Sequence, residues 1–304
     1  MTAQETYDLI LYATAKNNSQ GYVSPEDFFV TINQAQRSYV SYLLGSFQSY
    51  TPGRPFARVE LGQNMVVRTR LTPIIKWTNL TPTPVSFPFP NAGQSAYPAD
   101  YLQVDAMLTA DGKRVRAVQQ DYFYSFYNSV IDPVSSNPIY MLDENNFLIY
   151  PDSLGAARLS YVSNPPDIVW AYVLDGNGIP QYTTGIQGVN VIAGGTGYTT
   201  ASVTFSAPPA GGVQATANVI LNSGAITEIQ MVNYGSGYAN TTPTITLTGD
   251  GTGGVLSSPI VSFDPVWDNA SMLEIIIRSL SLIGVNLQLN TVEQYSAIIK
   301  NQGQ

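Results

Sequence analysis

Gly195-Thr196-Gly197-Tyr198 recurs forty residues later as Gly235-Ser236-Gly237-Tyr238, and the segment that holds both motifs decides how this chain is organised. Each copy follows a β-type run and precedes a Thr-rich one, and Gly211-Gly212-Val213 is matched by Gly253-Gly254-Val255. The pattern predicts a repeated unit of strand, Gly-x-Gly-Tyr turn, strand and Gly-Gly turn. Because one such copy is too short to bury a core, we expect the two to pack together as one β-domain.

The composition changes abruptly at the edges of this segment, residues 184–260. These 77 residues contain fourteen of the 25 glycines, no Lys or Arg, and two acids, Glu228 and Asp250. We therefore predict an inserted β-repeat domain at 184–260 and a host domain made of 1–183 and 261–304. Neither Gly-x-Gly-Tyr motif is followed by Lys-Ser/Thr or opens a helix, so we interpret the glycines as turn residues and not as a phosphate loop. The residues of these repeat turns are Gly195, Gly197, Tyr198, Gly235, Gly237 and Tyr238.

Both ends of the chain have helical patterns. Ser24-Pro25-Glu26-Asp27 combines an N-cap hydroxyl, a first-turn proline and two acids, and the apolar periodicity that follows ends at Gly45. Further helices are predicted at 2–16, 272–283 and 291–300. The resulting fold class is α+β: a helical bundle host domain with a short antiparallel β extension and an inserted all-β duplicated module.

The middle of the chain is expected to be irregular. Seven prolines between residues 50 and 98 disfavour long helices and central strands, which leaves a Pro-rich extension with one hairpin, 56–61 paired with 65–71. Residues 97–101 are predicted as a short helix or extended turn, and Asp121 as the cap of a helix to about Asn128. Strands are predicted at 114–118, 139–142, 147–150 and 158–162, the last three as an antiparallel meander.

This extension also contains five of the thirteen basic residues: Arg54, Arg58, Arg68, Arg70 and Lys76. One interpretation is a patch that contacts passing DNA or an acidic partner. The other, which we favour, is the solvated face of a hairpin.

Charge and hydroxyl content indicate how the surface is used. Only 11% of residues are charged, compared with about 25% in typical proteins, while the chain has twenty tyrosines. Tyr-rich surfaces with few charges are typical of contact surfaces, which favours a subunit of an assembly. The net charge of −8 argues against a protein whose main task is to bind nucleic acid, although a ring that lets DNA pass is compatible with it.

The sequence offers little to build an active site from. It has no His and no Cys, so the common nucleophilic triads and transition-metal sites are excluded. Most acids occupy cap or turn positions, and Asp143-Glu144-Asn145 is interpreted as a hairpin turn because calcium-loop spacing is missing. We expect no enzyme, no catalytic residue, no cofactor and no metal. No signal peptide or membrane anchor is expected either.

The host pattern resembles a known family through a series of short motifs. They are Tyr97-Pro98-Ala99-Asp100-Tyr101, Arg114-Val115-Arg116-Ala117-Val118, Asn128-Ser129, Pro133, Asn137-Pro138-Ile139-Tyr140, Ile149-Tyr150-Pro151, Leu159-Ser160-Tyr161, Pro165-Pro166, Phe263 and Leu282-Ile283-Gly284-Val285-Asn286-Leu287. Their order is similar to that in head-to-tail neck ring (adaptor) proteins of crAss-like podoviruses. The inserted repeat is similar to modules of phage tail and virion proteins.

This resemblance implies a virion protein of the phage neck, assembled in the host bacterial cytoplasm. Roughly twelve copies would form a homo-oligomeric ring that binds the portal protein and the next tail or ring protein and lines the DNA exit channel without sequence specificity. The basic extension and the inserted module then become the expected contact surfaces. The alternatives are another tail or fibre-attachment component, a cell-wall-degrading virion enzyme, and a secreted adhesin.

Overall fold

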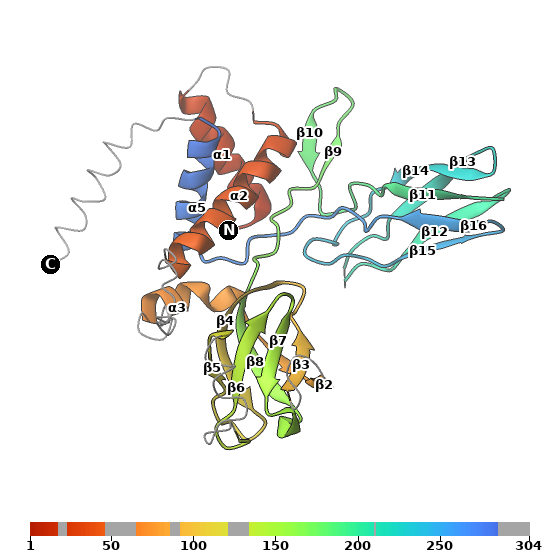
Figure 1. Cartoon of the computed structure of the whole chain (residues 1–304). Helices are drawn as coiled ribbons and strands as arrows, with labels where there is room; N and C mark the ends of the chain where they lie inside the picture. Colours follow the sequence, from red (N-terminus) through yellow and green to blue (C-terminus); the bar gives the residue numbers. More distant parts are fainter. Residues whose placement is uncertain (18–22, 46–64, 86–91, 121–133, 210, 285–304) are drawn as a thin grey trace. The chain divides into compact units, whose positions relative to one another are not determined.

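The computed structural model of the chain describes residues 1–17, 23–45, 65–85, 92–120, 134–209 and 211–284 (Figure 1). It is 39% strand and 25% helix, arranged in several small sheets. The predicted helical bundle host domain is therefore wrong. Among the described residues, the long helices lie at the two ends of the host segment. Its middle consists mostly of short apolar runs separated by turn residues, and these pair as strands.

Two compact units make up the chain. Unit 1 consists of Met1–Gln36 and Pro166–Gln304, and unit 2 of Arg37–Pro165. The repeat segment 184–260 lies within unit 1.

Three helices contribute to unit 1: α1 (Ala3–Asn17), the first part of α2 (Pro25–Leu44), and α5 (Asn269–Leu282). These confirm the helices predicted from the capping and periodicity signals, and Asp268 caps α5 by accepting from the backbone amide of Ser271. The ring of Tyr7 meets that of Phe28 edge-on at 5.1 Å, which packs α1 against α2. The helices predicted at 291–300 and after Asp121 lie outside the described residues.

The buried side-chain amides of two α2 residues hold the segments that precede and follow the repeat against this helix. Asn33 donates to the carbonyl of Ile168 (3.0 Å) and accepts from its amide (2.8 Å), so its side chain acts like a strand partner. Gln36 donates to the carbonyl of Pro166 and accepts from the indole of Trp267 (both 2.9 Å). Two polar residues on an otherwise apolar helix face are thereby satisfied.

The segment that leads into the repeat pairs with the segment that follows it. Val169 and Phe263 exchange backbone hydrogen bonds, and Gly188 pairs with Ile260. A small hairpin, β9 (Tyr172–Leu174) and β10 (Pro180–Tyr182), branches from the outgoing chain.

Unit 2 contains two sheets that share one core. One has the order β1-β8-β4, from β1 (Ile75–Leu80), β8 (Ala157–Ser163) and β4 (Tyr101–Thr109). The other has the order β2-β3-β7-β6-β5, from β2 (Thr83–Val85), β3 (Ala92–Ala96), β7 (Asn146–Tyr150), β6 (Ile139–Asp143) and β5 (Arg116–Ala117). Buried side chains from both sheets, among them Leu159, Met107 and Phe147, form a single cluster, which is the interior of a sandwich.

Two predictions within unit 2 are wrong. Residues Met65–Leu71 form a helix, α3, instead of half a hairpin. Leu71 is fully buried at its end, and the α-helix stops there, two residues before Pro73. The three predicted strands exist, but they do not form a meander. β6 pairs with β7, whereas β8 pairs with β4 and β1 in the other sheet. The hairpin half at 56–61 lies outside the described residues.

The repeat forms six strands in three antiparallel pairs. They are β11 (Val191–Thr196) with β16 (Thr252–Leu256), β12 (Ala201–Phe205) with β15 (Ile245–Gly249), and β13 (Thr216–Asn222) with β14 (Ala225–Asn233) (Figure 1). Each pair joins a strand of the first copy to a strand of the second. One shared core lies inside, with Tyr198, Tyr238, Phe205 and Ile226 among its members. The expectation that the two copies pack together is confirmed, whereas the domain boundaries at 184–260 stay a prediction.

Candidate functional site

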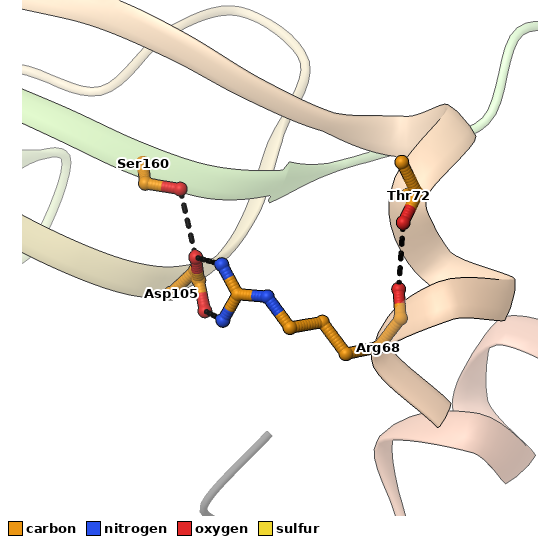
Figure 2. Close-up of polar contacts among 4 residues, drawn as sticks. All are labelled: Arg68, Thr72, Asp105 and Ser160. Carbon is orange, nitrogen blue, oxygen red and sulfur yellow. Dashed lines mark hydrogen bonds and ion pairs between the residues drawn. The ribbon is translucent and has the colours of Figure 1, made fainter. Parts of the chain in front are cut away.

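Arg68, one of the five predicted contact residues, binds Asp105 within unit 2 (Figure 2). Its two terminal nitrogens donate to the two carboxylate oxygens, each at 3.0 Å, and Ser160 Oγ donates to the same carboxylate at 2.8 Å. The side chain of Asp105 is only 5% exposed, compared with 41% for Arg68. A bidentate pair of this kind orients both groups and neutralises the arginine locally.

The local backbone explains why these two residues meet. The pairing of β4 with β8 shifts register between Val104 and Ala106, so Asp105 lies at a bulge. Arg68 is on α3, whose last turn is closed by a hydrogen bond from Thr72 Oγ1 to the Arg68 carbonyl (3.0 Å) (Figure 2). The pair therefore attaches α3 to the outer side of the β1-β8-β4 sheet.

Lys76 is also paired. Its ammonium group forms a salt bridge with Asp100, whose other oxygen accepts from the hydroxyl of Tyr161 at 2.8 Å. Burial alone would raise the pKa of Asp100, but the hydrogen bonds from Lys76 and Tyr161 outweigh it and lower that pKa. Burial and the Asp100 carboxylate raise the pKa of Tyr161 to about 12.

Arg70 donates to the hydroxyl of Tyr39 at 3.2 Å. Arg54 and Arg58 lie outside the described residues. Each described member of the predicted basic set thus has a polar partner within unit 2, and two of them are neutralised by a carboxylate. These pairings hold unit 2 together, whatever else the residues contact.

Sequence reasoning missed two exposed features of unit 2. The guanidinium of Arg158 lies 5.4 Å from the ring centre of Trp77, which is 51% exposed, so the two form a cation–π pair on the outer face of the sheet. Lys113, Arg114 and Arg116 are exposed around the buried Val115. Three cations within four residues were the available signal, but the segment was interpreted only as a strand.

Each Gly-x-Gly-Tyr motif lies against the Gly-Gly segment of the other copy, Gly195 beside Gly254 and Gly237 beside Gly212. All four motif glycines have positive φ: +65° and +79° at Gly195 and Gly197, and +69° and +83° at Gly235 and Gly237. These angles favour glycine. Because Gly195 belongs to strand β11, the interpretation of the motif glycines as turn residues stays a prediction. The tyrosine that follows each turn is buried, with 6% exposure at Tyr198 and none at Tyr238.

One of the two acids of the module joins the copies. The carboxylate of Asp250 accepts from the amides of Thr199 and Thr200, both at 2.9 Å, and from the Thr199 hydroxyl. These hydrogen bonds, led by that from the Thr199 side chain, hold the pKa of Asp250 well below its ordinary value. Although such a shift is often a sign of function, here turn capping accounts for it.

Among the described residues, no three His, Cys, Asp or Glu side chains gather where they could hold a metal ion. Within the same part of the chain, no helix is long and apolar enough to cross a membrane. No protein-family model matches the chain, and no curated protein sequence matches it.

Proposed function

We propose that this protein is a structural subunit of a bacteriophage neck, one copy of a homo-oligomeric ring that joins the portal to the tail and surrounds the DNA exit channel. The proposal combines the neck-protein resemblance of the host sequence with the surface of the folded chain. In this role the residues act by contact and need no chemical step.

The observation that carries the proposal is the second apolar face of α5. This helix buries Met272, Ile275 and Leu280 against unit 1, yet it also exposes Leu273 (49%) and Ile277 (37%), four residues apart on its outer side. Beside them lie the partly exposed Glu274 and Arg278, so the outer side of α5 combines an apolar strip with a charged border. Exposed apolar strips with polar borders are typical of interaction surfaces. In a ring, a neighbouring subunit would cover the exposed Leu273 and Ile277.

The wider surface has the same character. Twenty large apolar side chains of the described residues are exposed, on a chain with 11% charged residues. Scattered exposed apolar residues are ordinary, but with so few charges they give the surface the composition of subunit interfaces.

The test is imaging and mass measurement of the purified full chain. Negative-stain microscopy is expected to show closed rings, and light scattering a mass that is an integer multiple of 32.9 kDa. The double variant Leu273→Glu/Ile277→Glu should lose the rings. Its matched control, Gln4→Glu/Gln181→Glu, adds the same charge at two exposed polar positions of unit 1 and should keep them.

A chain that stays monomeric at every concentration would contradict the ring. Labelling of intact virions with a specific antibody separates the neck from the second candidate, a tail or fibre-attachment component. Label at the tail tip would favour that second candidate.

A further inference from the structure

The two units differ sharply in net charge. Residues 37–165 contain ten of the thirteen basic and nine of the 21 acidic residues, a net charge of +1. The remainder of the chain has three basic and twelve acidic residues, a net charge of −9. All of the protein's excess negative charge therefore belongs to unit 1.

Within unit 2, one group of cations projects from a fixed turn. After β4 the chain reverses at Gly112 (φ +78°), and the backbone of Lys113 is held from both sides: its carbonyl accepts from the Thr109 amide at 2.7 Å and its amide donates to Thr109 Oγ1 at 3.0 Å. Val115 is 1% exposed, and its amide donates to the Met107 carbonyl at 2.9 Å. With Val115 directed inward, Lys113, Arg114 and Arg116 are left outside; we call these three residues the basic turn.

The basic turn contrasts with the other described cations of unit 2 whose contacts are given above. Arg68 and Lys76 are bound to Asp105 and Asp100, and Arg158 lies over Trp77. Within the described part of the chain, no side chain pairs with the cations of the basic turn. Asp111 is the nearest acid in the sequence and is exposed, so residues 111–116 keep a net charge of +2.

We propose that the basic turn is an interaction surface that binds the acidic unit 1 of a second copy of this chain. The contact would be head-to-tail, because the two surfaces differ, and repeated head-to-tail contacts generate rings when the rotation closes. Charge complementarity between unlike surfaces steers association and fixes which faces meet. This inference rests on the proposed ring and names one of its contacts.

Charge also favours a second copy over DNA as the occupant. Three cations neutralise few phosphates, and the net charge of −8 repels the rest of a duplex. Unit 1, in contrast, has a net charge of −9 and belongs to a protein that is present at the same concentration.

The experiment measures self-association of the full chain by sedimentation velocity over a concentration and salt series. Wild type is expected to associate, more weakly as salt increases. The variant Lys113→Gln/Arg114→Gln/Arg116→Gln should weaken association about tenfold, because exposed ion pairs contribute little individually and are lost together. Arg114→Lys/Arg116→Lys keeps the charge and should retain association.

A matched control separates this surface from net charge in general. Gln4→Glu/Gln181→Glu/Asn218→Asp changes the net charge by the same three units, at exposed positions of unit 1. It should associate at least as well as wild type. Equal weakening in both triple variants, or no weakening in the basic-turn variant, would overturn the inference.

Two further outcomes are informative. Salt-dependent compaction without concentration dependence would mean that the attraction is within one chain, and would overturn the proposal. The proposal would also be overturned if, in fluorescence anisotropy, wild type bound a labelled DNA duplex and the basic-turn variant did not, while self-association was the same in both. If the basic-turn variant still forms closed rings, the proposed function stands and the basic turn is not one of the ring's contacts. If wild type forms no rings but its association is lost in the basic-turn variant, the contact stands and the proposed ring is contradicted.

Discussion

The hydroxyl of Tyr198, in the first copy of the repeat, accepts a hydrogen bond from the backbone amide of Gly254 in the second copy (3.3 Å). The reverse contact joins Tyr238, in the second copy, to the amide of Ala215 in the first (3.2 Å). Each copy thus supplies a ring that completes the core of the other. Neither half has a complete interior alone, so the module is expected to fold as one cooperative unit.

Removal of the two hydroxyls should have unequal effects. Tyr238 is fully buried and also donates to the Ser206 carbonyl (3.0 Å), whereas Tyr198 is 6% exposed. We expect Tyr238→Phe to lower the free energy of unfolding of the module by about 1–3 kcal/mol, and Tyr198→Phe by less, because each change leaves a backbone amide unsatisfied. Hydrogen exchange of the module in the full chain measures this. Tyr234→Phe, at a 40% exposed tyrosine, is the control and should be neutral; equal losses in all three variants would contradict the assignment.

The two glycines of the first turn should differ in their tolerance of alanine. Both have positive φ, which costs an L-residue about 1–2 kcal/mol. At Gly195 an added Cβ would also lie 2.6 Å from the Gly254 amide, whereas at Gly197 its nearest neighbour is 4.0 Å away. Gly195→Ala should therefore destabilise the module more than Gly197→Ala, as measured by thermolysin digestion, since the module has no trypsin sites. The opposite order would mean that the strand pairing of β11 with β16 is wrong.

Asp250 should make the module sensitive to acid. Its pKa is lowered by folding from an ordinary value of 3.8, so its contribution is present at neutral pH and is lost as the pH falls through the lowered value. Asp250→Asn should melt below wild type at pH 7, and the difference should narrow on acidification below about pH 4. Calorimetry at pH 7, 5 and 3 measures the difference. Glu228→Gln is the control, because Glu228 is exposed in the middle of strand β14 and does not cap a turn. A difference that does not change with pH would exclude the charge as its cause.

The Arg68–Asp105 pair should behave as a coupled unit. Arg68→Ala leaves an almost buried carboxylate with fewer partners, and because the arginine is 41% exposed we expect a loss of only about 1–2 kcal/mol. The double variant Arg68→Ala/Asp105→Ala should cost less than the sum of the single variants. Hydrogen exchange in β4 and β8 reports the effect within unit 2. Strict additivity would show that the two side chains do not interact in solution.

Local signals in the sequence were sufficient for much of the secondary structure. Ser24-Pro25 and Gly45 mark the start and the end of α2, and glycine occupies twelve of the fourteen positive-φ positions of the described residues. The strands β6 and β7 were predictable because their apolar runs flank an Asp-Glu-Asn turn. None of these features depends on distant residues.

Strand pairing was beyond those signals. β8 is apolar and short, and nothing in its own residues indicates that it pairs with β1 and β4 instead of β7. In the repeat, the sequence match aligns Gly212 with Gly254, but the fold aligns it with Gly251: Gly237 lies against Gly212 as Gly197 lies against Gly251. A two-residue motif has too little information to fix a register that is chosen by packing.

The sequence by itself determined where helices and turns occur, that the repeat is a single β-domain, and that the surface has few charges, because each of these follows from local conformational preference or composition. Tertiary structure alone decided which cations are free. Arg68 and Lys76 find carboxylates 37 and 24 residues away, whereas the basic turn at 113–116 finds none among the described residues. Whether a charge is compensated depends on how close the fold brings an opposite charge in space, because the attraction falls with that distance. The separation of two residues along the chain does not determine it.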